Sequence, residues 1–439
     1  MCDSMIASKK VTGCGYHIFG KNSDRSPNEP QPMVYIPAAD HAAGSTVRAT
    51  QIEVEQAAHT YAVILSKPSW IWGGEIGINE KGVVIGNEAV ISRDMDKEAK
   101  ALLGMDILRI ALERAATAKE AVQVIGEMME RYGQGGNCSF DGIFYYDNAY
   151  LIADSDEIWH VETAGQHKWV ARKVEEPGYS ISNYISINYP DLMHKDIVAH
   201  AREAGYDVED PFDFAKAYAY WDNLGSSGML RRCCSFQQMM RPGRNFRLAD
   251  MLTALRSHNC NDEWTEAMHC VCMHAQNPQY PSDVDCQTTN SMIAVMKPGD
   301  NLILAPGMST PCIAPFQPFW FDAYSSKQVF GYDRMEDGVE AWLKREAINR
   351  AAIDGRLPVK DYRDEMHAME KRWIEGAEKI SRSDRQAFVD ANADEMDAFI
   401  EKWAAICARE KPAPRGTVGF QKWWGAKNEA LGKDRRLAR

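Results

Sequence analysis

The sequence predicts an α+β protein in which sheets and helices pack in layers. The first half of the 439-residue chain alternates short runs of β-branched and aromatic residues with Gly, Asn, Asp and Pro, which is the pattern of strands joined by turns. Residues 105–131 change to the apolar spacing of helices, and strand-like runs then return. Strand blocks on both sides of a helical pair favour a layered α+β architecture.

Each element is expected from its local pattern. Two helices are expected within 105–131, where Thr117 and Glu120 form a capping box that starts the second one. Residues 190–257 are mixed, and helix-forming Ala, Glu, Lys and Arg dominate 336–410. The expected strands lie at 5–7, 16–19, 33–36, 61–65, 82–85, 142–146, 149–152, 158–161, 169–172, 291–296 and 301–305.

Composition argues against several classes of protein. The net charge of -12 argues against a nucleic-acid binder, which needs a basic surface for the phosphates. No apolar run approaches the ~20 residues that cross a bilayer, so no membrane partner is expected. Ser8, Lys9 and Lys10 interrupt the start of the chain before an export signal could form, and we therefore expect a cytoplasmic protein. The eleven cysteines are scattered, which is typical of reduced, buried thiols.

Cys2 directly follows the initiator methionine. Because a small second side chain normally allows Met1 to be removed, Cys2 could carry a free α-amine with an ordinary pKa of ~7.7–8.0. Such an amine could accept the proton of the thiol, so one residue would supply both nucleophile and base. Position alone favours a cysteine without a catalytic role, and the assignment depends on further motifs.

The segment Gly-Lys-Asn-Ser-Asp-Arg at 20–25 contains no apolar residue and follows a strand-like run. Its composition is that of a polar hairpin turn. If the flanking strands pair, this turn would lie near Cys2. Asp24 could then bind the α-ammonium group, while Lys21 or Arg25 could lower the pKa of the thiol.

Together these motifs resemble the N-terminal-nucleophile peptidases of the dipeptidase A and secernin family, and more distantly the choloylglycine hydrolases and penicillin V acylase. Asn-Ser-Asp-Arg at 22–25 and Ile-Gly-Asn-Glu-Ala at 85–89 are most similar to the secernin-like branch. The likeness covers roughly residues 2–325. The segments that carry it are 1–4, 19–25, 77–89, 159–165, 181–184, 288–291 and 311–319.

The resemblance implies a four-layer αββα fold with the nucleophile at the start of a central strand. It implies a hydrolase domain over 1–330 and a helical C-terminal extension over 331–439. Cys2 would attack the substrate carbonyl, Asp24 would hold the α-amine, and Asn183 would stabilise the oxyanion. The resemblance assigns Cys2, Asp24, Asn183 and Arg231 to catalysis, and Lys21, Arg25, Asn87, Glu88 and Arg232 to substrate binding. The arginine of the family's site would correspond to either Arg231 or Arg232. The second polar position of that site would correspond to either Asn87 or Glu88.

The implied activity is hydrolysis of dipeptides or other small amides through a thioester on Cys2. This chemistry needs no metal or other cofactor, and a homo-oligomer is possible. Two alternatives were weighed. A zinc site could use Cys270, Cys272 and His274 on one face of a strand, but their spacing is not that of structural zinc sites, which favours buried thiols instead. The chain could also be a non-catalytic, secernin-like regulatory or interaction scaffold.

Overall fold

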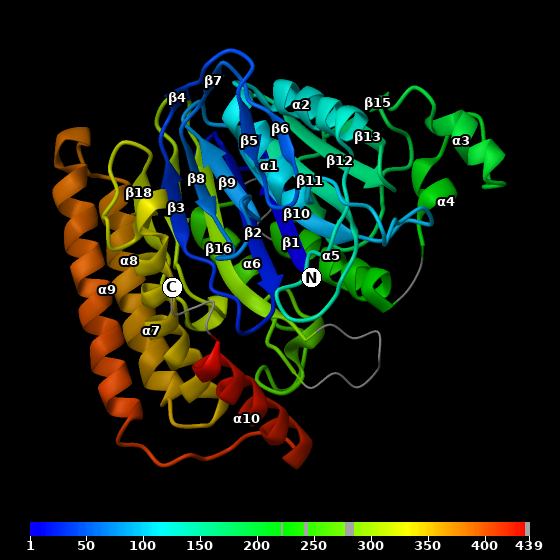
Figure 1. The fold of residues 1–439 in the computed structure, drawn as a ribbon. Helices are drawn as coiled ribbons and strands as arrows, with labels where there is room; N and C mark the ends of the chain where they lie inside the picture. Colours follow the sequence, from blue (N-terminus) through cyan, green and yellow to red (C-terminus); the bar gives the residue numbers. More distant parts are fainter. Residues whose placement is uncertain (221–222, 241–244, 277–284, 435–439) are drawn as a thin grey trace.

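Two large sheets face each other, and helices cover their outer faces (Figure 1). The computed structural model describes residues 1–220, 223–240, 245–276 and 285–434. The six-stranded sheet is antiparallel, with the order β14 (Gly178–Ile181), β1 (Cys2–Ala7), β2 (His17–Arg25), β16 (Gln287–Met296), β17 (Leu302–Ala305) and β18 (Gln317–Trp320).

The second sheet has nine strands and is antiparallel except for its last pair, β3 with β19. Its order is β15 (Leu192–Met193), β13 (Lys168–Lys173), β12 (Ile158–Ala164), β11 (Asp147–Ala153), β10 (Val84–Val90), β9 (Ile76–Asn79), β8 (Val63–Ser66), β3 (Met33–Ile36) and β19 (Val329–Gly331). Two small ribbons pair β4 (Ala39–Asp40) with β7 (His59–Thr60), and β5 (Thr46–Arg48) with β6 (Glu53–Glu55).

The helices form the outer layers. Helices α1 (Gly104–Arg114) and α2 (Ala118–Arg131) pack on the nine-stranded sheet, and the Thr117 hydroxyl caps α2 as predicted. Helices α5 (Asn223–Met240) and α6 (Leu248–Leu255) pack on the six-stranded sheet. The remaining helices are α3 (Ile197–Glu203), α4 (Phe214–Tyr218), α7 (Met335–Ile353), α8 (Val359–Ala377), α9 (Arg385–Cys407) and α10 (Val418–Lys433).

This arrangement confirms the α+β class and the four-layer αββα fold. One apolar core lies between the two sheets, and separate cores join each sheet to its own helices. A further core joins the C-terminal helices to Trp264, Met308 and Ile313, which lie before residue 330. The division of the chain at residue 330 therefore stays a prediction. Among the described residues, no helix combines the length and apolar character needed to span a bilayer.

The prediction of a turn at residues 20–25 was wrong, because these residues form the second half of β2. The strand is paired on both sides, by β1 and by β16, and every one of its residues is buried. In the first of these pairings, Cys2 lies opposite Ser23. The predicted proximity of this segment to Cys2 is thus present, but as a strand pairing in the middle of the sheet.

Two predicted strands are also absent. Residues 142–146 form a loop, because the side-chain oxygen of Asn137 accepts the backbone N–H groups of Ser139 and Phe144. Residues 270–274 follow the short 3₁₀ turn η1 (Ala267–His269) as irregular chain. Beyond the predicted helical region, α10 forms an additional helix whose first turn is capped by Thr417.

Gly86 on β10 shows how closely the two sheets approach beside the buried polar residues. A Cβ atom there would lie 2.5 Å from Ser4 Oγ and 2.6 Å from Lys21 Cδ. Gly86→Ala should therefore destabilise the protein by about 1–3 kcal/mol through overpacking, measured as the free energy of unfolding in urea.

Gly425→Ala is the matched control, since among the described residues no atom beyond the helix's own nearby backbone lies within 4 Å of a Cβ atom at this position in α10. It should be neutral or stabilise by up to about 1 kcal/mol, because Ala is the better helix former. Equal effects of the two substitutions would contradict the tight contact at Gly86.

Candidate active site

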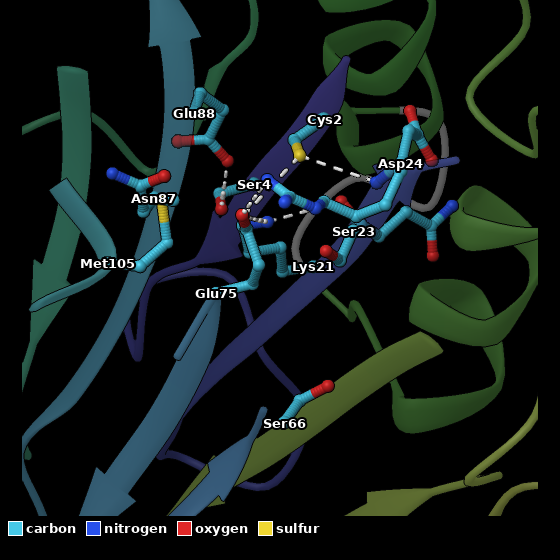
Figure 2. A network of polar contacts seen from close by, with 12 residues as sticks. Cys2, Ser4, Lys21, Ser23, Asp24, Ser66, Glu75, Asn87, Glu88 and Met105 are labelled. Carbon is cyan, nitrogen blue, oxygen red and sulfur yellow. Dashed lines mark hydrogen bonds and ion pairs between the residues drawn. The ribbon is translucent and has the colours of Figure 1, made fainter. Parts of the chain in front are cut away.

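The alternation of side chains along β1 and β2 divides the site into two faces. Successive residues of a strand point to opposite faces of the sheet. Cys2 and Lys21 point into the layer between the sheets, where each contacts Glu75 (Figure 2). Arg25 lies on the same face of β2 and also pairs with Glu75. Asp3 points the other way and forms an ion pair with Arg231 of α5.

The Cys2 thiol is buried against polar partners. Its Sγ lies 3.8 Å from Glu75 Oε2 and accepts the backbone N–H of Asp24 at 3.3 Å. Burial, with the carboxylate of Glu75, raises the pKa of Cys2 to about 12, although Lys21 opposes this shift. The thiol is thus protonated at neutral pH, and attack on a carbonyl requires a base.

Glu75 is the centre of the buried charge network and was not identified from the sequence. It lies 3.7 Å from Lys21 Nζ and 2.9 Å from Arg25 Nη1. Burial disfavours the charged form of Lys21, but Cys2, Glu75 and Glu88 outweigh this effect and raise its pKa to about 12. The available sequence signal was an acidic residue between Gly73-Gly74 and an apolar strand, a position where a surface charge is not expected.

The backbone nitrogen of Cys2 is held by the side chain of Asn183. It donates to Asn183 Oδ1 at 2.9 Å, and this oxygen also accepts from Arg231 Nη2 at 2.5 Å. Asn183 Nδ2 donates to the Ala89 carbonyl at 2.7 Å. The Cys2 nitrogen and Arg231 are both donors, so the atom between them must be the amide oxygen of Asn183. In a flipped amide, the NH₂ group would face both donors. In this arrangement Asn183 accepts at the Cys2 nitrogen and has no N–H directed at the thiol.

Asp24 lies on the opposite face of β2, near the chain terminus. The Met1 amine donates to the Asp24 carbonyl at 2.9 Å, and Thr288 donates to Asp24 Oδ1 at 2.6 Å. The second carboxylate oxygen makes no hydrogen bond with the described residues. Burial raises the pKa of Asp24 to about 7, against the lowering effect of the amine.

Arg231 rather than Arg232 contacts Cys2. Arg231 is fully buried and donates to the Cys2 carbonyl at 3.0 Å and to Asp3 Oδ2 at 2.6 Å. Arg232 instead donates to the Ser180 carbonyl and to the Tyr184 hydroxyl.

The two polar candidates on β10 lie on opposite faces of the strand. Glu88 is inside the layer, where it bonds Ser4, and burial raises its pKa to about 8 (Figure 2). Asn87 donates to Asn148 on the face covered by α1. The structure therefore brings Glu88, and not Asn87, to the layer that contains Cys2.

A cavity of about 50 Å³ opens beside Cys2. Asp24, Arg25, Glu75 and Cys286 are among its lining residues, and Met1 forms part of its wall. The Met1 side chain is 7% exposed and packs in an apolar cluster with Met268, Met273 and Cys286.

Comparison with known proteins identifies the family. The model of peptidase family C69 matches residues 1–248, more than half of the chain. The chain belongs to peptidase family C69. Among curated relatives, a dipeptidase of Bifidobacterium longum is 26% identical over 44% of this chain and 38% of its own length. A probable dipeptidase of Salmonella dublin is 23% identical over 55% of this chain and 58% of its own. The chain thus matches less than two thirds of either relative.

Among solved structures, a conjugated bile acid hydrolase of Clostridium perfringens is 15% identical to this C69 member. The match covers 69% of this chain and 88% of that chain, with a TM-score of 0.41. A likeness at this level carries no inference about activity.

Glu88 should make the stability of this C69 member depend on pH. Its raised pKa means that the folded chain holds a proton that the unfolded chain releases between pH ~4.5 and ~8, so its contribution falls as pH rises through this window. Glu88→Gln replaces the carboxyl group with a neutral amide, so this loss of stability with rising pH is removed. The stability advantage of the variant over wild type, measured as the free energy of unfolding in urea, should be larger at pH 9 than at pH 5. The difference should be on the order of 3 kcal/mol.

The exposed Glu53 of β6 is the control, and Glu53→Gln should leave the pH dependence unchanged. If the free energy of unfolding of Glu88→Gln changed between pH 5 and pH 9 by as much as that of wild type, a buried and protonated Glu88 would be contradicted.

Proposed function

We propose that this C69 member is a cysteine-dependent dipeptidase or small-amide hydrolase in which Cys2 becomes the N-terminal nucleophile when Met1 is removed. One observation carries the proposal. The thiol and the nitrogen of Cys2 both lie in a buried polar site beside a cavity, and separate partners hold each of them.

In the proposed cycle, the α-amine of Cys2 is the base. With its pKa raised to about 12, the thiol gives up its proton only during attack. An ordinary α-amine, with a pKa of ~7.7–8.0, is partly neutral at pH 7–8 and belongs to the same residue. Asn183 Oδ1 already accepts from this nitrogen, and Arg231 holds Asn183 in place. We therefore assign Asn183 to orientation of the amine, in place of the oxyanion role expected from the resemblance.

The reaction then follows two acyl transfers. The thiol sulfur of Cys2 bonds to the substrate carbonyl carbon while its proton moves to the amine. The resulting ammonium protonates the leaving nitrogen as the amide bond breaks, which leaves a thioester on Cys2. Water, deprotonated by the same amine, attacks the thioester and releases the acid, and the thiol recovers its proton. Asp24, on the neighbouring strand, stabilises the ammonium form by its charge.

The charge of the cavity lining favours binding of the positively charged amino end of a dipeptide. Acidic side chains outnumber basic ones among the lining residues, and Arg25, the lining base, has its donors occupied by Glu29, Glu75, Tyr146 and Cys138. Two lysines behind the lining also pair with acids: Lys21 with Glu75, and Lys427 with Asp285. The acids remain in excess, which suits a substrate ammonium group. The names of the curated relatives, dipeptidase and probable dipeptidase, support the same substrate class.

One observation favours the alternative of a non-catalytic scaffold. With Met1 in place, the cavity of about 50 Å³ is far smaller than the ~300–1,000 Å³ of small-molecule sites. A chain that keeps Met1 has neither a free Cys2 amine nor room for a dipeptide. Loss of Met1 would supply both, so the state of the N-terminus separates the two functions.

Cys2→Ala should abolish hydrolysis of dipeptides, lowering kcat/KM by about 10³-fold or more, because the proposed mechanism forms its thioester on Cys2. Release of free amino acids from a panel of dipeptides measures this. Cys286→Ala is the matched control, since Cys286 is a buried thiol of the same cavity, and it should keep activity within about tenfold of wild type.

Equal loss in both variants, or an active protein that retains Met1, would contradict the proposal. The same assay also tests the proposed substrate class. A dipeptide with an N-acetylated amino end should be cleaved more slowly than the free dipeptide, and equal rates would contradict recognition of the ammonium group.

A further inference from the structure

Four potential metal ligands converge in the structure, away from Cys2. They come from three separate segments: His258 follows α6, Cys272 and His274 follow η1, and Cys312 lies in the 3₁₀ turn η2 (Pro311–Ile313). The ligand atoms of these four side chains all lie within 4.8 Å of one another. Three of the side chains are buried, and His258 is partly exposed.

The distances match the edges of a tetrahedron around one ion. His274 Nε2 lies 3.2 Å from His258 Nε2, 3.5 Å from Cys272 Sγ and 3.4 Å from Cys312 Sγ. With Zn–N of about 2.0–2.1 Å and Zn–S of about 2.3 Å, a regular tetrahedron has edges of about 3.3 Å between nitrogens and about 3.6 Å between nitrogen and sulfur. The three measured separations agree with these values.

We propose that His258, Cys272, His274 and Cys312 bind one divalent, thiophilic metal ion, Zn²⁺ by its chemistry, in a closed structural site. Two thiolates and two imidazoles in a tetrahedron are the ligand set that selects zinc over the oxygen-seeking ions. Two thiolates also neutralise the ion, so the buried assembly carries no net charge. With four protein ligands no position is left for substrate, which makes the site structural.

The surroundings provide a second layer of support. His258 Nδ1 faces Glu263 Oε2 at 3.4 Å, which would fix the ring with Nε2 directed to the ion. Arg363 of α8 pairs with both oxygens of Glu263, at 2.7 and 2.9 Å, and also donates to the Cys312 carbonyl. A surface hollow of about 740 Å³, which His258 and Glu263 help to line, provides a path from solvent.

The proposed metal would hold one wall of the active site. Met273 lies between two of its ligands, and its backbone forms hydrogen bonds in both directions with Thr288. The Thr288 hydroxyl in turn donates to Asp24. The Met273 side chain also belongs to the apolar cluster around Met1. The metal would therefore fix the loop that supports Asp24 and borders the cavity.

This ligand set differs from the zinc site weighed from the sequence. Cys270, which that reading included, points elsewhere, and its Sγ accepts the backbone N–H of Asn259. The partners of Cys272 and His274 are instead His258 and Cys312, which lie 14 residues before and 40 residues after Cys272 in the sequence.

The test is the metal content of the purified full-length protein after dialysis against metal-free buffer, measured by mass spectrometry of the elements. We expect about one zinc per chain in wild type and loss of that zinc in Cys272→Ser and Cys312→Ser. The buried neighbouring thiol provides the matched control, and Cys270→Ser should keep its zinc. Co²⁺ added to metal-free wild type should give the intense visible bands of a tetrahedral site and a thiolate charge-transfer band.

The Co²⁺ spectrum of wild type decides the question even if the variants fail to fold, and neither measurement depends on hydrolytic activity. Wild-type protein with far less than one metal per chain and no thiolate band with Co²⁺ would overturn the proposal. A disulfide between Cys272 and Cys312 in the native protein would overturn it as well, as would full metal retention in Cys272→Ser/Cys312→Ser.

Discussion

The structure depends on the pairing of buried charges between its two sheets. Lys21 and Arg25 project from β2 into the buried layer between the sheets, where an unpaired charge costs several kcal/mol. Glu75, the residue just before β9 of the facing sheet, contacts both groups. Glu75 also contacts the Cys2 thiol, so the same carboxylate brings the facing sheet against Cys2. The polar residues of β2 therefore belong to the middle of a strand, despite a composition typical of turns.

The same burial determines which chemistry the thiol can perform. Burial and a nearby carboxylate raise the pKa of Cys2 to about 12, so the thiol is protonated at neutral pH. A nucleophile of this kind needs a base within reach, and the proposed cycle gives this role to the α-amine that Cys2 gains when Met1 is removed. Asn183 and Arg231 hold the nitrogen on one side of the residue, while Asp24 and Glu75 contact the sulfur on the other. The proposed function thus depends on two groups of Cys2, its nitrogen and its thiol.

The sequence predicted the features that are local or carried by family motifs. The family, the layered fold and the proximity of Cys2 to Asp24 follow from residues 1–25 and the later motifs. Glu75 could not be found in this way, because its role arises from contact with strands about 50 residues away in the sequence. The proposed metal ligands pose the same problem, since His258 and Cys312 meet Cys272 only in the folded chain. The strand at 20–25 was missed because pairing on both sides overrides local turn preference.

The most direct test of the central claim is to trap the acyl-enzyme. Wild-type protein is mixed with a cleavable dipeptide, quenched in acid within a single turnover, digested at low pH and analysed by mass spectrometry. The account predicts an N-terminal peptide that begins at Cys2 and carries the acyl group of the substrate on its thiol, and this peptide should disappear as turnover is completed. An active enzyme whose N-terminal peptide still begins at Met1, or whose acyl group is found on another residue, would contradict it.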